Sequence, residues 1–210
     1  DYSTPIELDA NPRLFSYKDK LVEHCLDGTI LLRDRTSSDF ISMTSELRIV
    51  HDPRDGMTEQ ELAGIERVRA ILATSIPDDE TRQVVVRAIA VFLLRYKIMQ
   101  GHREFVLMVG SQGTGKSLIL HTAMLLGGDY TQTLDPRHLK VVSDLTVRAL
   151  TNNKTRLHLV HEMKEMNTLL LKTVWAATHM SATRACHADE YDKPPSECKL
   201  LIGAQNPEDL

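Results

Sequence analysis

The spacing of hydrophobic residues changes along the chain and predicts different structure in different regions. In the first 55 residues, short apolar stretches alternate with Asp, Gly and Pro, and the stretches at 29–32 and 40–43 predict short strands joined by turns. From Thr58 the spacing is that of a helix. Thr58 and Glu61 fit a capping box, and a second helix is predicted from Glu80 to Met99.

The rest of the chain alternates strand-like and helix-like segments. The continuous apolar run at 105–109 has the length of a strand that is covered on both faces, and a helix is predicted at 118–126. Two further strands are predicted at 157–160 and 199–203, and two further helices at 143–150 and 167–178. This alternation is typical of a parallel sheet with helices on its faces.

Composition narrows the class of protein. Of the 210 residues, 42 % are hydrophobic and 26 % are charged, which excludes a disordered or low-complexity chain. No apolar run is long enough to span a membrane and no leader opens the chain, so we expect an intracellular protein that is not secreted. Three cysteines without ligand-like spacing argue against a disulfide scaffold or a zinc site.

Charge is distributed unevenly. The formal net charge is −4, yet residues 137–184 hold eight basic and three acidic residues. A nucleic-acid-binding protein needs only one positive surface, so this excess is compatible with such a partner. An ordinary solvated surface explains it equally well.

Residues 110–117 match the phosphate-loop pattern of Gly, four residues, Gly-Lys-Ser, between a predicted strand and a predicted helix. Glycines let backbone N–H groups point at a phosphate, and the N-terminus of the following helix adds a favourable dipole. The lysine can reach the β- and γ-phosphates, and the serine hydroxyl can bind Mg²⁺. We therefore expect a nucleotide to be held by Gly110, Ser111, Gln112, Gly113, Thr114, Gly115, Lys116 and Ser117.

Polar residues follow two of the later predicted strands. Glu162 is the candidate that holds magnesium, directly or through water, and orients an attacking water molecule. Beside it, His161 is expected to pack or to form hydrogen bonds, and Glu165 to face solvent. Asn206 can contact the γ-phosphate or the attacking water, or can be a turn residue before the next proline.

The order and spacing of these three motifs resemble the superfamily 3 helicases, the compact AAA+ replication motors of viruses, phages and plasmids. The chain is most similar to their poxvirus, giant-virus and phage primase-helicase branch. The resemblance covers about residues 20–210 and spans the region from the first predicted strands to the last motif. It is carried further by Leu26–Leu32, Asp78–Leu94 with Glu104 and Phe105, Leu126–Tyr130, Leu171 and Lys172, Arg184, and Tyr191–Ile202.

The chain departs from that branch in three places. Thr114 is closer to the phage form of the loop, and residues 177–179 replace the branch's Gly-Gly-Asp with Ala-Thr-His, which weakens the case for DNA contacts there. A single acid ends the second strand of the core, so it stays open whether Glu162 serves magnesium, water or both. The family's arginine finger is expected beyond Leu210, and the chain is expected to belong to a longer protein.

The resemblance implies an α/β fold, a P-loop AAA+-like parallel sheet with flanking helices, preceded by a smaller and mainly helical N-terminal region. We expect three parts: a strand and turn region at 1–57, a helical annex at 58–101 and the ATPase core at 102–210. A primase domain or other replication partners are expected to accompany them.

The same resemblance implies an enzyme, an ATP- and Mg²⁺-dependent DNA helicase that translocates on single-stranded DNA during viral or mobile-element replication. It would act in the host cytoplasm or nucleus, away from membranes. Lys116 and the loop would hold phosphate, Ser117 and Glu162 would hold magnesium and position water, and Asn206 would sense the γ-phosphate.

Such motors form rings, usually hexamers, with ATP between subunits and DNA in the pore. Four residues are candidate DNA contacts: Lys172, Arg184, His187 and Lys193. Lys172 and Arg184 could instead contact a neighbouring subunit or form a surface charge pair. His187 and Lys193 could instead be solvated residues of a loop.

Two other functions use the same loop. A small-molecule phosphotransferase needs arginines that grip phosphate after the loop helix, and Arg137 and Arg148 are the candidates. A nucleotide-binding AAA+ module could instead act as an assembly switch, because the chain shows a single acid and no arginine finger. ATP hydrolysis with and without single-stranded DNA distinguishes these functions.

Overall fold

The computed structural model describes residues 7–11, 13–25, 27–49, 56–93, 105–140, 155–165 and 199–206. The described residues fall into two compact units, one up to residue 93 together with 125–129, the other at 105–124 and from 130 onward. The helices predicted at 143–150 and 167–178 lie outside the described residues. No helix within the described ranges has the length and apolar character that a membrane crossing requires.

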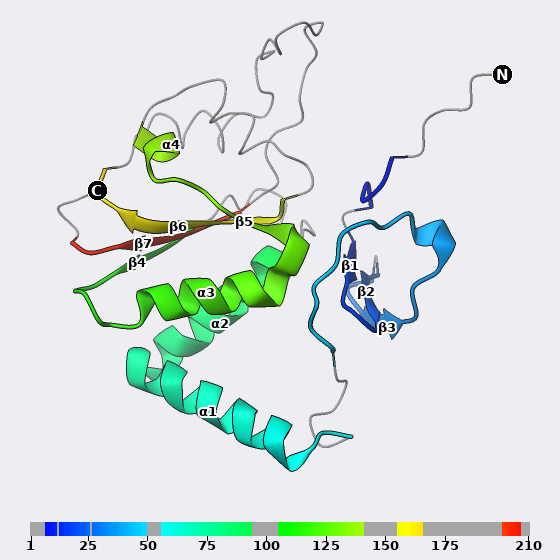
Figure 1. Ribbon diagram of the computed structural model, residues 1–210, viewed down its shortest axis with the longest axis horizontal. Coiled ribbons are helices and arrows are strands. Elements are labelled where there is room, and N and C mark those ends of the chain that lie inside the picture. The colour runs from blue at the N-terminus through cyan, green and yellow to red at the C-terminus, as the bar shows by residue number, and fades with distance from the viewer. Residues whose placement is uncertain are drawn as a thin grey trace, which may run out of the picture. The chain divides into compact units, whose positions relative to one another are not determined.

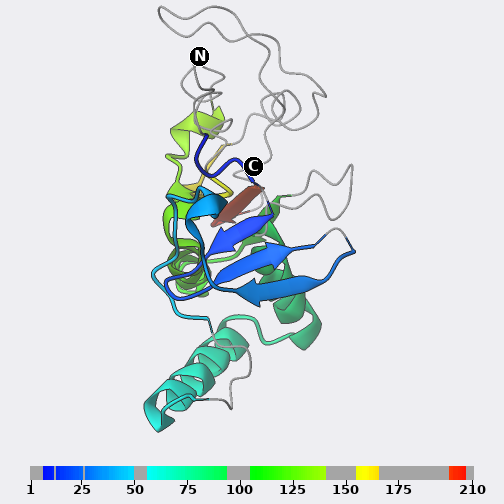
Figure 2. The ribbon, with the colours of Figure 1, turned by 90° about the vertical axis from the view of Figure 1, so that its right-hand side faces the viewer.

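The first unit contains a three-stranded antiparallel sheet in the order β1–β2–β3 (Figure 2). Its turns are closed locally. The Tyr17 amide donates to the Lys20 carbonyl oxygen at 2.8 Å, and the Asp27 carboxylate accepts from the Thr29 amide at 2.9 Å. The strand predicted at 29–32 is confirmed, and the strands are β1 Leu14–Ser16, β2 Leu21–His24 and β3 Ile30–Arg33.

The prediction of a strand at 40–43 is wrong. Phe40 adopts a left-handed backbone with φ of 49°, which interrupts an extended ladder. The Asp9 carboxylate then accepts from the amides of Ser42, at 2.9 Å, and Met43, at 3.1 Å. A side chain thus takes the donors that a neighbouring strand would use, as Asp often does in turns.

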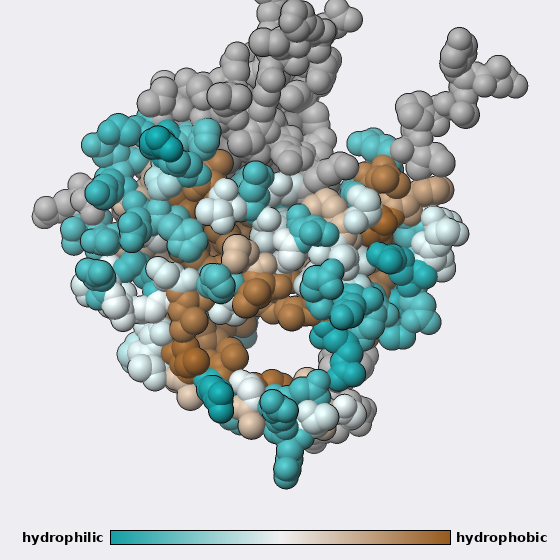
Figure 3. Space-filling view, viewed as in Figure 1, coloured by the Kyte–Doolittle hydropathy of each residue, from teal (hydrophilic) through white to brown (hydrophobic). Residues whose placement is uncertain are grey.

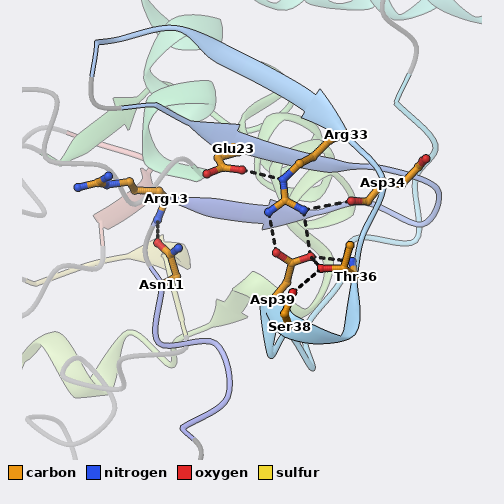
Figure 4. Close-up of polar contacts among 8 residues, drawn as sticks. All are labelled: Asn11, Arg13, Glu23, Arg33, Asp34, Thr36, Ser38 and Asp39. Carbon is orange, nitrogen blue, oxygen red and sulfur yellow. Dashed lines mark hydrogen bonds and ion pairs between the residues drawn. The ribbon is translucent and has the colours of Figure 1, made fainter.

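A charged network fixes the chain after β3 (Figure 4). The Arg33 guanidinium donates to both carboxylate oxygens of Asp39, at 2.6 and 3.0 Å, and to Glu23 at 2.7 Å. Asp39 ends the short 3-10 helix Ser37–Asp39 and also accepts from the Thr36 amide. The Arg33 hydrogen bonds hold the pKa of Asp39 well below its usual range.

Two helices follow, α1 Glu59–Ser75 and α2 Asp79–Leu93. The predicted capping box is confirmed, because the Thr58 hydroxyl accepts from the Glu61 amide and the Glu61 carboxylate accepts from the Thr58 amide. The second predicted helix is confirmed as far as Leu93, and its remainder lies outside the described residues. Hydrophobic residues of both helices reach the surface (Figure 3): Leu62, Val68, Ile71, Val84, Val86 and Val91.

Within the first unit, Gly128 and Asp129 meet the segment of Thr44 and Ser45. The Thr44 amide donates to the Asp129 carboxylate at 3.0 Å, and the Asp129 amide donates to the Thr44 carbonyl oxygen at 3.1 Å. Gly128 has φ of +52°, and a Cβ there would lie 2.7 Å from the Ser45 Cα and the Thr44 carbonyl oxygen. The contact therefore leaves no space for a side chain at Gly128.

The second unit contains a four-stranded sheet in the order β4–β7–β6–β5, with every neighbouring pair parallel (Figure 1). Helix α3 covers one face and buries Ile119, Leu120 and Ala123. From residue 105 onward the elements are β4 Val106–Val109, α3 Lys116–Gly127, the 3-10 turn Gly128–Tyr130, β5 Thr131–Thr133, α4 Arg137–Lys140, β6 Leu157–Met163 and β7 Lys199–Ala204. The fold class is α/β, with a smaller N-terminal region that adds an antiparallel sheet to the predicted helices.

At the start of β6 an arginine is buried against an aromatic ring. The Arg156 guanidinium carbon lies 4.3 Å from the centre of the Tyr130 ring. The backbone amide of Arg156 donates to the Tyr130 carbonyl oxygen at 2.8 Å. Both side chains are buried. This cation–π contact joins the residue before β6 to the residue before β5.

Replacing Gly128 with alanine should lower the free energy of unfolding by about 2 kcal/mol or more, because the new methyl group meets backbone atoms and the positive φ disfavours it. Gly64→Ala is the matched control. Gly64 lies inside α1, and a Cβ at that position would have nothing within 4 Å, so alanine there should stabilise by up to about 1 kcal/mol. Urea unfolding followed by circular dichroism measures both, and equal effects would contradict the close contact.

Asp39→Asn should lower stability at pH 7 by on the order of 1 kcal/mol, because the amide cannot replace the carboxylate toward Arg33. The pKa of Asp39 is lowered in the folded chain, so the carboxylate's contribution is complete above its ordinary pKa of 3.8 and decreases as the pH falls below that value. The stability difference between variant and parent should therefore shrink below pH 3.8.

The control is Asp34→Asn, since Asp34 is 81 % exposed in its ion pair with Lys20 and should contribute little. Urea unfolding at several pH values between about 2.5 and 7, chosen around the ordinary pKa of Asp39, compares the two. A stability difference for Asp39→Asn that does not change with pH would contradict the role of its charge.

Candidate functional site

The carboxyl ends of the four parallel strands lie at one edge of the sheet, and the loop from β4 to α3 turns at that edge (Figure 1). A cleft of about 290 Å³ lies there. Parallel α/β sheets bind their ligands outside the carboxyl ends of the strands, so its position is that of a binding site. The cleft is lined by residues 112–118, Leu120, Glu162 and residues 203–205.

The predicted phosphate loop has the backbone that a phosphate cradle requires. Gly113 and Gly115 have φ of +85° and +87°, a conformation that residues with a side chain rarely adopt. The Thr114 hydroxyl donates to the Ser111 carbonyl oxygen at 2.9 Å and closes the loop. Helix α3 begins directly afterwards at Lys116, and the amides of Leu118 and Ile119 donate to the Gly115 carbonyl oxygen. The two amides before them, at the N-terminus of the helix, are placed to bind an anion.

The side chain of Lys116 lies inside the loop. Its ammonium group donates to the carbonyl oxygen of Ser111 at 2.8 Å, to that of Gly110, and to the Thr114 hydroxyl at 3.3 Å. These acceptors are neutral, whereas a phosphate would add the attraction between opposite charges to the hydrogen bond with the ammonium group. A phosphate in the cleft can therefore draw the lysine away from the loop carbonyls.

Strand β7 forms the floor of the cleft, and a glycine near its end gives room to the side chain of Leu120 on α3. A Cβ on Gly203 would lie 3.2 Å from Leu120 Cδ1 and 3.9 Å from Lys116 Cβ. Gly203 was not among the predicted site residues. A glycine inside an otherwise apolar strand often marks the close approach of another group, and that signal could have identified it.

Glu162 lies in the opposite wall of the cleft, and β6 extends to Met163 instead of ending at Val160 as predicted. The pairing of β6 with β7 shifts between Val160 and Met163, where β6 carries one extra residue. Glu162 has a left-handed backbone with φ of 53° at this bulge. Bulges redirect side chains and are frequent next to functional sites, and here the bulge accompanies the placement of the carboxylate at the cleft.

An amide side chain that was not among the predicted site residues lies at the cleft just beyond the end of β7. Gln205 lines the cleft and Asn206 is not among the lining residues, and both are exposed. Gln205 directly follows Ala204, the last residue of β7. The signal for it in the sequence is a polar amide directly after an apolar strand, a signal that Asn206 shares.

The other predicted residues lie apart from the cleft or outside the described ranges. His161 is half-buried, and Glu165 is exposed and pairs with Lys140. The described part of the chain holds no group of three or more His, Cys, Asp or Glu side chains that could bind a metal ion. The four candidate DNA contacts lie outside the described residues: Lys172, Arg184, His187 and Lys193.

Comparison with known proteins finds likeness only at the level of structure. No family model matches the sequence, and no curated protein matches it. An apo structure of the NrS-1 C-terminal region matches with a TM-score of 0.52 at 14 % identity, over 94 % of this chain and 42 % of that one. An A form apo structure of the same region has a TM-score of 0.44 at 12 % identity, over 92 % and 54 %.

The chain thus spans less than half the length of the first of these structures. At 14 % identity the likeness concerns the fold, which is distantly related to that of the NrS-1 C-terminal region.

Proposed function

We propose that this chain is the nucleotide-binding core of an ATP-hydrolysing replication motor. One observation carries the proposal: a single cleft is lined by the phosphate loop with Lys116, by Glu162 and by the end of β7. A loop that can bind phosphates and an acid that faces it across a cleft are the parts that nucleotide hydrolysis needs.

The donors in the cleft suit a magnesium nucleotide. Mg²⁺ prefers oxygen ligands and is usually held by one or two protein groups together with phosphates and water. The Ser117 hydroxyl and the Glu162 carboxylate both line the cleft and are the groups that would hold it. When bound, the ion neutralises charge on the β- and γ-phosphates.

Sheet geometry favours a role for Glu162 toward water. Strand β7 lies between β4 and β6, so two strand spacings, about 10 Å, separate the strand of the loop from the strand of Glu162. This span leaves room for a terminal phosphate and a water molecule in line with it. Glu162 then orients that water and accepts its proton, while Lys116 stabilises the charge on the phosphate.

We further propose a superfamily 3 type of DNA helicase, working as a ring, usually hexameric, on single-stranded DNA. The order of the three motifs supports it, together with the excess of basic residues at 137–184. The ring, the DNA, and the roles of Lys172, Arg184, His187 and Lys193 stay predictions. The same holds for the three predicted domain boundaries, for Asn206 as a γ-phosphate sensor and for an intracellular location.

A small-molecule phosphotransferase has less support. Arg137 donates to the Asp135 carboxylate, at 2.6 Å through its Nη2, and these bonds lower the pKa of Asp135 to about 2. Its helix follows β5, which is three strand spacings, about 14 Å, from β4. Arg137 is thus already paired and remote from the loop, and Arg148 lies outside the described residues.

Lys116→Ala should reduce ATP turnover by at least about a hundredfold, because the cleft loses its cation at the phosphates. Glu162→Gln should retain ATP binding and lower turnover by about a hundredfold, since the amide cannot accept a proton. Glu165→Gln is the matched control, because that exposed carboxylate pairs with Lys140 and should leave turnover unchanged. Phosphate release and binding of a fluorescent ATP analogue measure the effects; normal turnover in Lys116→Ala would contradict the loop's role.

Single-stranded DNA should increase ATP turnover severalfold, because a translocase couples hydrolysis to movement along its strand. Phosphate release is measured with single-stranded DNA, with duplex DNA and without DNA, and Lys116→Ala serves as the background control. Turnover that depends on a small acceptor molecule would favour the phosphotransferase. Nucleotide binding without turnover, in the complete protein that carries this chain, would favour the assembly switch.

A further inference from the structure

The Thr114 side chain bonds to other residues of the phosphate loop. Its hydroxyl donates to the Ser111 carbonyl oxygen at 2.9 Å and accepts from the Lys116 ammonium group at 3.3 Å. We propose that Thr114 is a positioning residue, whose hydroxyl holds the empty loop in the conformation that binds phosphate. The inference rests on the function proposed above, and it concerns a position that the phosphate-loop pattern leaves free.

The backbone on both sides of Thr114 is adaptable. Gly113 and Gly115 have φ of +85° and +87°, and glycine loses more conformational freedom on ordering than any other residue. A loop that samples other conformations binds its ligand more weakly, in proportion to the fraction of molecules in the binding form. A bond that restrains the residue between the two glycines therefore raises that fraction.

The threonine ties this segment to the part of the loop that the sheet holds. Gly110 is fixed at the sheet, because its amide donates to the Ala204 carbonyl oxygen at 3.2 Å. A Cβ on Gly110 would lie 3.1 Å from Thr114 Oγ1, so the threonine packs closely on that residue. The hydrogen bond to Ser111, the next residue, adds a directed contact to the same fixed start of the loop.

The two hydrogen bonds of the hydroxyl respond differently to a bound phosphate. The bond from Lys116 is longer than those from the same ammonium group to the two loop carbonyl oxygens, so it is the weakest of the three. It is lost when a phosphate draws the lysine away, whereas the bond to Ser111 does not involve the ammonium group. The hydroxyl thus organises the loop before the nucleotide arrives, and its loss costs affinity more than the rate of the chemical step.

The test replaces the hydroxyl with a methyl group in Thr114→Val, and Thr122→Val is the matched control. The Thr122 hydroxyl donates to the Leu118 carbonyl oxygen, also at 2.9 Å, but it lies inside α3 and Thr122 does not line the cleft. Thr114→Val should weaken the binding of ADP and of ATPγS by about threefold to tenfold, as expected for one hydrogen bond between neutral groups. Thr122→Val should change either affinity by less than about twofold. Calorimetry measures both.

Two further readouts separate positioning from a general loss of structure. Thr114→Ser keeps the hydroxyl and should restore most of both affinities. In ATP turnover, KM should rise in Thr114→Val while kcat falls by less than about threefold, because the hydroxyl acts before the chemical step.

Unchanged affinities in Thr114→Val, or a loss that Thr114→Ser shares in full, would overturn this inference and leave the proposed function standing. A loss confined to kcat, or confined to ATPγS, would overturn it as well, because ADP and ATPγS share the phosphates that the loop cradles. If the unaltered chain bound neither nucleotide, the proposed function and this inference would both be overturned.

Discussion

The hydrogen bond from the Gly110 amide to the Ala204 carbonyl oxygen, 3.2 Å long, joins the first residue of the phosphate loop to the end of the central strand β7. It extends the parallel pairing of β4 and β7 by one residue past Val109. The loop therefore starts from a fixed backbone position. Beside it, Gly203 leaves room for Leu120, which packs helix α3 against β7.

The pairing of β6 with β7 brings the acid to the same edge. Leu157, Leu159, Val160 and Met163 are fully or almost fully buried and hold β6 in place on both sides of the bulge. A left-handed backbone at a residue such as Glu162 costs about 1–3 kcal/mol and persists only where the surroundings enforce it. The buried strand supplies that constraint, and the strained residue is the acidic one that lines the cleft.

Much of this arrangement could be predicted from the sequence, because local signals agree with the fold. The capping box at Thr58, the glycine pattern of the phosphate loop and the apolar runs of the core strands each specify a local structure that the chain adopts. The bulge at Glu162 was not predictable, since it depends on how β6 pairs with β7. For the same reason Phe40 was assigned to a strand, although the distant Asp9 carboxylate takes the neighbouring amides.

The stretch Leu126–Tyr130, which carried part of the family resemblance, has a structural role in this chain. Gly128 has no space for a side chain, Asp129 bonds the backbone of Thr44, and Tyr130 is buried beneath the Arg156 guanidinium. None of its five residues lines the cleft. Similarity in such a stretch is evidence for a shared fold, as is a structural match at 14 % identity. The conclusion about nucleotide chemistry therefore depends on the loop, Glu162 and the end of β7, whose placement around one cleft is the property that a fold alone does not guarantee.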